Sequence, residues 1–155
     1  MSVILDIAEN FWLVSAISAW FVAQFLKVLT GLFRDRSFDL LTLMFATGGM
    51  PSSHTASVVA LTTAAGLSFG LSSFAFAATF MFSMVVMIDA MGVRRETGEQ
   101  AKILNRMMKE TLFSKDPEMW NRTLKELVGH TPLQVAAGAA VGVIVPVVYC
   151  LTPWF

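Results

Sequence analysis

No charged residue occurs between Thr55 and Ile88, and this stretch constrains the fold more than any other feature of the sequence. As a single α-helix it would extend about 51 Å, whereas the hydrocarbon core of a bilayer is only about 30 Å thick. The segment should therefore fold back on itself, and the break is offered by Gly66, Gly70, Ser72 and Ser73. We expect a hairpin of two membrane spans near residues 52–70 and 72–91.

Two further apolar segments have the length and composition of membrane helices. The first is Phe11–Leu26, which extends to Phe33 if Lys27 places its ammonium group at the membrane surface. The second is Pro132–Leu151, with its proline at a position suited to a helix start. Because 55% of the residues are hydrophobic and 14% are charged, the sequence predicts an all-α integral membrane bundle of about four spans, with residues 1–155 as one domain.

The segments between the spans are shorter or more polar. Leu40–Thr47 is apolar but too short to cross a bilayer, so we expect a re-entrant or interfacial segment there. Residues 92–130 form a polar loop. Apolar side chains recur in it at helical spacing, which predicts an amphipathic helix on the membrane surface: Ile103, Leu104, Met107, Met108 and Leu112.

The basic residues predict the orientation in the membrane. Eight of the eleven Lys and Arg side chains lie in residues 92–130, and the other three lie in or beside the loop after the first span. Because such residues favour the cytoplasmic side, both loops should be cytoplasmic, and both termini should lie outside the inner or plasma membrane. A net charge of zero gives no reason to expect nucleic acid as a partner.

The chain has two histidines, and the predicted topology places both at the cytoplasmic surface. His54 ends the string Gly48-Gly49-Met50-Pro51-Ser52-Ser53-His54, in which a glycine-containing loop leads into a helix. The free N–H groups and the positive dipole end of such a helix bind phosphate well. In the alternative interpretation, Ser52 or Ser53 is only a helix N-cap and His54 is a polar interface residue.

His130 stands in Gly129-His130-Thr131-Pro132, four residues after Glu126, whose carboxylate could fix the imidazole tautomer. The alternative is an ordinary solvated loop histidine. Lys27 and Arg34 are seven residues apart, so they share one face of a helix near the same membrane surface. Two cations, a helix N-terminus and two histidines would together form a phosphate site with a nucleophile and an acid. The sequence contains no Cys/His metal cluster and no nucleotide-binding glycine loop, so we expect no metal and no cofactor.

These motifs resemble those of the type 2 phosphatidic acid phosphatase superfamily, the histidine phosphatases related to vanadium haloperoxidases. The motifs of that superfamily read Lys-x6-Arg-Pro, Pro-Ser-Gly-His and Ser-Arg-x5-His-x3-Asp. Lys27 to Arg34 has the first spacing, with Asp35 in place of proline, and Pro51-Ser52-Ser53-His54 has the second, with Ser53 in place of glycine. The third motif is incomplete around His130, because Gln134 stands where the orienting aspartate is expected.

The chain is more similar to the small, divergent membrane branch of that superfamily. Gly-Gly-Met-Pro-Ser-Ser-His, Asp89-Ala-Met-Gly-Val-Arg94-Arg95 and Gly-His-Thr-Pro all resemble signatures of this branch, and they span most of residues 24–142. The resemblance implies that His130 is the nucleophile and His54 the general acid. It also implies a set of groups that hold the phosphate oxygens, namely Lys27, Arg34, Ser52 and Ser53.

The incomplete third motif leaves a cation and a carboxylate to be supplied from elsewhere. We expect Arg94 or Arg95 to provide the cation, and Asp89 or Glu126 to provide the carboxylate. Asp89 lies at the end of an apolar span, where an unpaired acid is costly. The alternative is that Asp89 forms only a structural ion pair with Arg94 or Arg95.

The expected function is a metal-independent phosphatase that acts on a membrane lipid phosphate or pyrophosphate at the cytoplasmic face, through a phosphohistidine at His130. The alternative, favoured by Gln134, is a head-group-binding or scaffold protein that has lost turnover. A channel or transporter subunit is a weaker alternative. Gly138-x-x-x-Gly142 in the last span predicts close helix packing, either within the chain or in a homodimer.

Overall fold

The computed structural model describes residues 3–34, 49–108, 124 and 129–152, and within these ranges it contains helices and no strands. In chain order the helices are α1 (Val3–Ala8), α2 (Phe11–Arg34), α4 (Ser53–Phe69), α5 (Phe74–Met91), α6 (Val93–Met107) and α8 (Pro132–Cys150). The predicted re-entrant segment Leu40–Thr47 lies outside the described residues, as does Leu112.

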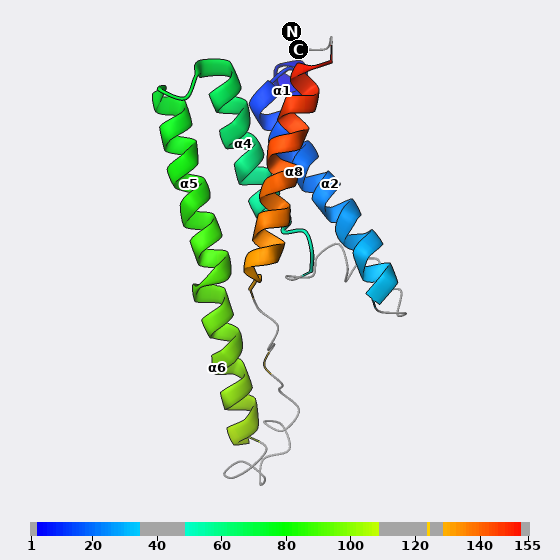
Figure 1. The fold of residues 1–155 in the computed structure, drawn as a ribbon, viewed down its shortest axis with the longest axis vertical. Coiled ribbons are helices and arrows are strands. Elements are labelled where there is room, and N and C mark those ends of the chain that lie inside the picture. The colour runs from blue at the N-terminus through cyan, green and yellow to red at the C-terminus, as the bar shows by residue number, and fades with distance from the viewer. Residues whose placement is uncertain (1–2, 35–48, 109–123, 125–128, 153–155) are drawn as a thin grey trace.

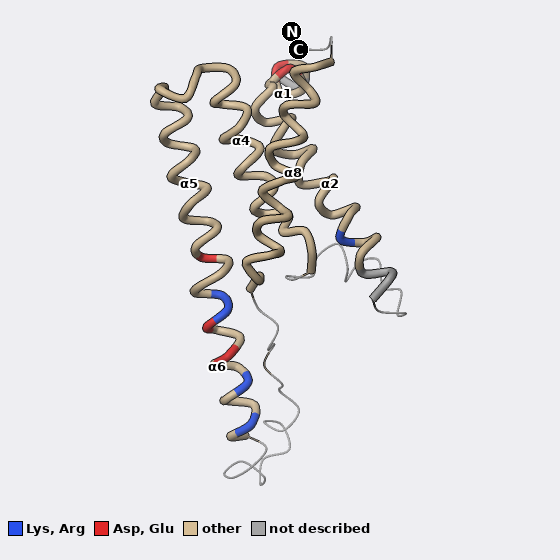
Figure 2. Tube along the Cα trace, in the orientation of Figure 1, with Lys and Arg blue, Asp and Glu red and all other residues tan. Residues whose placement is uncertain are grey.

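The helices α2, α4, α5 and α8 run alternately in opposite directions (Figure 1). The helix α1, the turn between α4 and α5, and the C-terminal end of α8 lie at one end of the bundle. The N-terminal ends of α4 and α8 lie at the other end, toward which the basic residues of α2 and α6 are placed (Figure 2). We call this the basic end. Both predicted loops leave the bundle from the basic end, as a four-span topology requires. That the basic end faces the cytoplasm stays a prediction.

Within the part of the chain that the structure describes, three helices are long and apolar enough to cross a membrane: Phe11–Thr30, the continuous Phe74–Met107, and Pro132–Cys150. The helix α4 has 17 residues, or about 26 Å of length, and it contacts α2, α5 and α8. Many large apolar side chains face outward from the bundle, among them Phe25, Phe82 and Ile144. The chain is therefore an all-helical integral membrane protein, as predicted. Three of the four expected spans correspond to α2, α5 and α8, whereas a membrane span at α4 stays a prediction.

The predicted break in the long uncharged stretch is present. The helix α4 ends at Phe69, and Gly70 follows with a φ of 81° and donates its N–H to Gly66 O. Ser73 then caps α5, and its hydroxyl accepts from the N–H of Phe76 at 3.1 Å. A left-handed glycine and a serine cap thus turn the chain back on itself, as the composition of this segment indicated.

Small residues bring α2, α4 and α8 close together. The core is formed by fully buried alanines of α2 and α4: Ala19, Ala23, Ala56 and Ala60. On α8, a Cβ atom added at Gly138 would overlap the carbonyl oxygen of Ser52, and one at Gly142 would lie 2.6 Å from Ala56 O. The motif Gly138-x-x-x-Gly142 therefore packs within the chain. The alternative of a homodimer through these two glycines is not supported, because α4 already covers them.

The predicted amphipathic helix is α6, and it continues the direction of α5 beyond the rest of the bundle (Figure 1). Its buried residues are Gly98, Ala101 and Asn105. The Asn105 side chain bonds both the N–H and the carbonyl of Leu124, each at 2.9 Å. The apolar residues whose spacing predicted this helix are exposed on its surface: Ile103, Leu104 and Met107.

Candidate active site

The two histidines and several of the predicted cations meet at the basic end. His54 lies in the first turn of α4, and His130 immediately precedes the cap of α8. Lys27 lies on α2, whereas Asp89 and Arg94 lie on either side of the junction between α5 and α6. Residues that are far apart in the sequence are thus brought to one end of the bundle by the alternating direction of the helices.

Ser52 caps α4 and also ties it to α8. Its hydroxyl accepts from the Thr55 N–H at 3.4 Å and from the Thr55 hydroxyl at 3.0 Å, and its own N–H donates to Gln134 O at 3.0 Å. Ser52 is fully buried and Ser53 is 3% exposed, whereas His54 is exposed. The N-cap alternative therefore holds for Ser52. Its role is to fix the first turn of α4, from which His54 projects.

The loop before α4 is fastened to α2 beside Lys27. The Thr30 hydroxyl donates to the carbonyl of Met50 at 2.7 Å. Gly49 has a φ of +90°, and a Cβ atom there would lie 3.2 Å from Lys27 Cγ, so the aliphatic part of the lysine lies against this glycine. Lys27 itself is only 5% exposed. The roles of Thr30 and Gly49 were not predicted, although the paired glycines of the loop were a signal of close backbone approach.

His130 is held by backbone contacts at the junction of α5 and α6. Its N–H donates to Ala90 O at 2.9 Å. The preceding Gly129 has a φ of +101°, and a Cβ atom there would lie 2.7 Å from Arg95 N, so only glycine fits without a shift. His130 is 5% exposed, which excludes the alternative of a solvated loop histidine.

The imidazole of His130 is buried without a hydrogen-bond partner among the described residues, at both Nδ1 and Nε2. Burial, followed by the charges of Lys27, His54 and Arg94, lowers the pKa of His130 from 6.5 to about 4. The ring is therefore neutral at neutral pH, with a lone pair available on one nitrogen. Lys27 and Arg94 are close enough to act electrostatically on both imidazoles.

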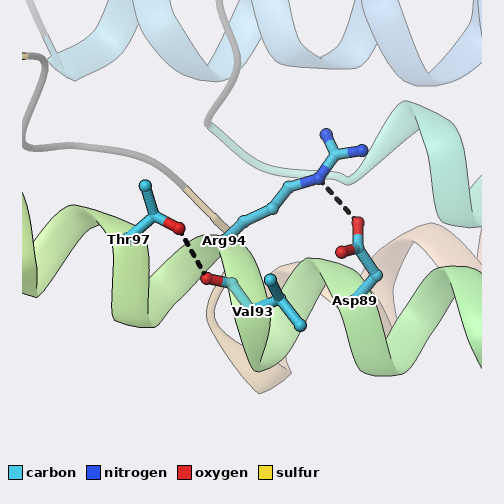
Figure 3. A network of polar contacts seen from close by, with 4 residues as sticks. All are labelled: Asp89, Val93, Arg94 and Thr97. Atoms are coloured by element: carbon cyan, nitrogen blue, oxygen red, sulfur yellow. Dashed lines mark hydrogen bonds and ion pairs between the residues drawn. The ribbon is translucent and has the colours of Figure 1, made fainter.

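Asp89 binds Arg94 rather than a histidine. Arg94 Nε donates to Asp89 Oδ2 at 2.7 Å, and Figure 3 shows the two terminal nitrogens of the guanidinium directed away from the carboxylate. Both side chains are partly exposed. Asp89 was expected either to supply the missing carboxylate or to form a structural ion pair, and the structure shows the ion pair with Arg94. The charge of Arg94, held in this pair, lowers the pKa of both histidines.

Gln134, which stands where the superfamily has its orienting aspartate, belongs to a capping box. Its Oε1 accepts from the Thr131 N–H at 2.9 Å, and its N–H donates to the Thr131 hydroxyl. These reciprocal bonds satisfy two backbone donors at the start of α8. The glutamine therefore fixes the helix start and does not bond His130.

The other predicted residues are placed less centrally. Arg95 is exposed, and its charge acts on Glu99 rather than on a histidine. Arg34 is the last residue of α2, and its side chain lies outside the described part of the chain, as does Glu126. Among the described residues, no group of three or more His, Cys, Asp or Glu side chains could hold a metal ion.

Comparison with known proteins assigns the chain to a family. The sequence profile of the divergent PAP2 family matches residues 8–145. The uncharacterized membrane protein YuiD of Bacillus subtilis (strain 168) is 38% identical over 153 residues, which cover 93% of this chain and 96% of YuiD. No solved structure matches the chain. The chain therefore belongs to the divergent PAP2 family of membrane proteins.

Proposed function

We propose that the protein is a metal-independent phosphatase that hydrolyses a lipid phosphate or pyrophosphate at the membrane surface through a phosphohistidine at His130. One observation carries the proposal. The His130 imidazole is buried, has no hydrogen-bond partner among the described residues and keeps a pKa of about 4, while the charges of Lys27, His54 and Arg94 act on it. A neutral nucleophile surrounded by cations is suited to attack a phosphate dianion.

In the first step, a ring nitrogen of His130 attacks phosphorus, and an N–P bond forms as the bond to the leaving oxygen breaks. Burial and the charges of Arg94 and Lys27 lower the pKa of His54, so His54 carries a proton only once the bound phosphate dianion offsets these charges. From the N-terminus of α4 it then gives this proton to the leaving oxygen, so that the lipid leaves as an alcohol. In the second step, water attacks the phosphohistidine and His54 takes a proton from it. Inorganic phosphate is released, and His130 returns to its neutral form.

The remaining groups hold the phosphate oxygens or position the groups that react, and they take no part in the covalent chemistry. Lys27 and Arg94 neutralise the charge of the transferring group, together with N–H groups in the first turn of α4, at Ser53 and His54. Asp89 binds Nε of Arg94 at 2.7 Å and so leaves both terminal nitrogens for the phosphate. Arg34 and Arg95 are assigned as outer cations, and Glu126 as the carboxylate that orients His130.

The location in the bilayer supports a lipid substrate. The histidines lie at one end of a bundle whose outward face is apolar, so a lipid can keep its chains in the hydrocarbon core while its head group reaches the cations. The excess of Lys and Arg in residues 92–130 assigns this end to the cytoplasmic face.

The experiment measures phosphate release by the purified protein in detergent with EDTA, from phosphatidic acid, phosphatidylglycerophosphate and prenyl phosphates. We expect release without metal and no phosphoenzyme in His130→Ala. His54→Ala should slow lipid phosphates by roughly 10²–10⁴-fold and spare nitrophenyl phosphate, whose leaving group needs no proton. Residual lipid turnover in His130→Ala would refute the nucleophile, and equal loss on both substrates in His54→Ala would refute the acid.

A binding protein without turnover is the second candidate, and the capping role of Gln134 favours it. With Oε1 bonded to Thr131, the glutamine does not replace the aspartate that would orient the nucleophile. Binding of radiolabelled phosphatidic acid with no phosphate release and no phosphoenzyme would establish this alternative. Loss of that binding in Arg94→Ala would then identify the same site as its head-group pocket.

A further inference from the structure

The buried residues of α6 lie on one face of the helix. They are Gly98, Ala101 and Asn105, spaced three and four residues apart. The same face continues onto α5, with which α6 forms the continuous helix Phe74–Met107, and there it includes Ala90, which is 4% exposed. Because glycine and alanine have little or no side chain, another segment can approach this face closely.

The chain that leads into α8 contacts this face at both of its ends. At one end, Asn105 Nδ2 donates to the carbonyl of Leu124 and Asn105 Oδ1 accepts from the Leu124 N–H, both at 2.9 Å. At the other end, the His130 N–H donates to Ala90 O at 2.9 Å, and Gly129 lies against the backbone of α6. One helix therefore holds both the nucleophile of the proposed reaction and a point six residues before it.

The side chain of Asn105 is suited to this contact. Its amide presents a donor and an acceptor side by side, so it can bond the N–H and the carbonyl of one residue together. Asn105 is 5% exposed, and a buried amide is costly unless it is bonded. Asparagine is also a poorer helix former than alanine, so helix formation does not explain its place in α6.

The two contacts on α6 are nearly as far apart as the chain allows. Asn105 and Arg95 are ten residues apart, which corresponds to a rise of about 15 Å along the helix. Leu124 and Gly129 are five residues apart, and five residues reach at most about 18 Å. A displacement of Leu124 by more than a few Å therefore acts on Gly129 and on the neighbouring His130.

We propose that Asn105 is a positioning residue, which holds the chain that leads to His130 through its two bonds to Leu124 and so keeps the imidazole buried at the basic end. Asn105 lies fifteen residues beyond Ala90, or about 22 Å along the helix, so it acts through the chain and touches no substrate. The effect on turnover rests on the proposed function, whereas the effect on the burial of the imidazole does not.

Chemical modification tests the placement of the imidazole without turnover. Diethyl pyrocarbonate is added to the full-length protein in detergent, and mass spectrometry compares its rate of reaction at the buried His130 with that at the exposed His54. We expect Asn105→Ala to raise this ratio about tenfold, because local release of the chain exposes the ring.

Two control variants separate this effect from a general loss of order. Gln100→Ala removes an amide from the exposed surface of α6. Gly70→Ala strains the turn at the far end of the bundle, where φ is positive, and so lowers stability away from the site. Both variants should leave the ratio of the two rates unchanged.

Kinetics then test the consequence for the reaction. With phosphatidic acid as substrate, Asn105→Ala should lower kcat about tenfold and leave KM unchanged. The nucleophile is then misplaced, whereas Lys27 and Arg94 still bind the phosphate. A variant that only destabilised the fold would lower the amount of active protein without this separation, and correction for the folded fraction would restore its kcat.

Each outcome bears on one of the two proposals. An unchanged labelling ratio in Asn105→Ala would overturn the inference, as would an equal rise in either control. A raised ratio with an unchanged kcat in an active enzyme would also overturn it, because the placement of the imidazole would then not matter. A raised ratio in a protein whose wild type releases no phosphate would uphold the positioning of His130 by Asn105 while refuting hydrolysis.

Discussion

Gly138→Ala tests whether the contact between α4 and α8 sets the geometry of the candidate active site. A Cβ atom at position 138 would overlap the carbonyl oxygen of Ser52 and lie 3.1 Å from Thr55 Cβ. At Gly142, one turn along α8, the added atom would lie 2.6 Å from Ala56 O, where an ordinary contact begins at 3.4 Å. Either substitution therefore forces α4 and α8 apart by about 0.8 Å or more.

This displacement reaches the site, because Ser52 caps α4 and donates its N–H to Gln134 of α8. His54 moves with the first turn of α4, whereas His130 is held by Ala90 of α5. A misplacement of about 1 Å costs on the order of 10²-fold in rate. Overpacking costs about 1–3 kcal/mol, of which the better helix propensity of alanine offsets about 1 kcal/mol. We expect Gly138→Ala to lower kcat about 100-fold and the free energy of unfolding by at most about 2 kcal/mol.

The assay combines phosphate release from saturating phosphatidic acid with thermal unfolding in the same detergent. Gly70→Ala is the matched control. Gly70 has a φ of 81° with a ψ of 158°, a conformation that essentially only glycine adopts, and nothing lies within 4 Å of an added Cβ atom, so alanine there costs about 1–3 kcal/mol of backbone strain at the far end of the bundle. This control should lose stability and keep its kcat. If Gly138→Ala kept most of the wild-type kcat, the link between helix packing and site geometry would be wrong.

Three further predictions concern charge and orientation. Because the folded-state pKa of His130 is about 4 against an ordinary 6.5, the unfolded chain binds the extra proton. The free energy of unfolding should therefore fall as the pH drops from 6.5 to 4, and His130→Asn should flatten this slope in a thermal unfolding series. Asp89→Ala should raise KM for phosphatidic acid about tenfold in wild type and not at all in Arg94→Ala, and a kinetic double-mutant cycle checks this. A cysteine at the exposed position Lys102 should resist impermeant reagents added to intact cells, and ready labelling would reverse the proposed orientation.

The arrangement of the spans could be predicted because it depends on local properties of the chain. An uncharged stretch too long for one crossing must turn, and Gly70 and Ser73 are residues that turns and caps favour. The contact face of α6 could not be predicted in this way. Its buried residue Asn105 is polar, and it is buried because it bonds the distant backbone of Leu124. Hydrophobic periodicity does not detect a helix face whose contacts are hydrogen bonds.

Motif spacing identified the two histidines and Lys27 as candidate site residues, but it did not reveal how several neighbours act. Ser52 and Gln134 both occupy positions where the superfamily resemblance implies direct roles in the site. In the structure, each bonds to the backbone at the start of a helix. Spacing could not distinguish Arg94 from Arg95 either, because adjacent residues on a helix point about 100° apart and only tertiary packing decides which one faces the histidines.

The glycines of the motifs explain how such a site can form in a bundle of few helices. Gly49 lies against the stem of Lys27, Gly129 against the backbone of Arg95, and Gly138 against the carbonyl of Ser52. At Gly129 and Gly138 a backbone segment beside a site residue approaches another element more closely than a Cβ atom would allow, whereas at Gly49 a Cβ atom would only crowd the Lys27 side chain. The reactive groups are thus positioned through backbone contacts, so the His130 imidazole needs no hydrogen bond from the described residues to hold it in place. A nucleophile restrained in this way keeps its lone pair for phosphorus, and this is why substitutions at Gly129 and Gly138, unlike those at Gly70, should affect kcat more strongly than stability.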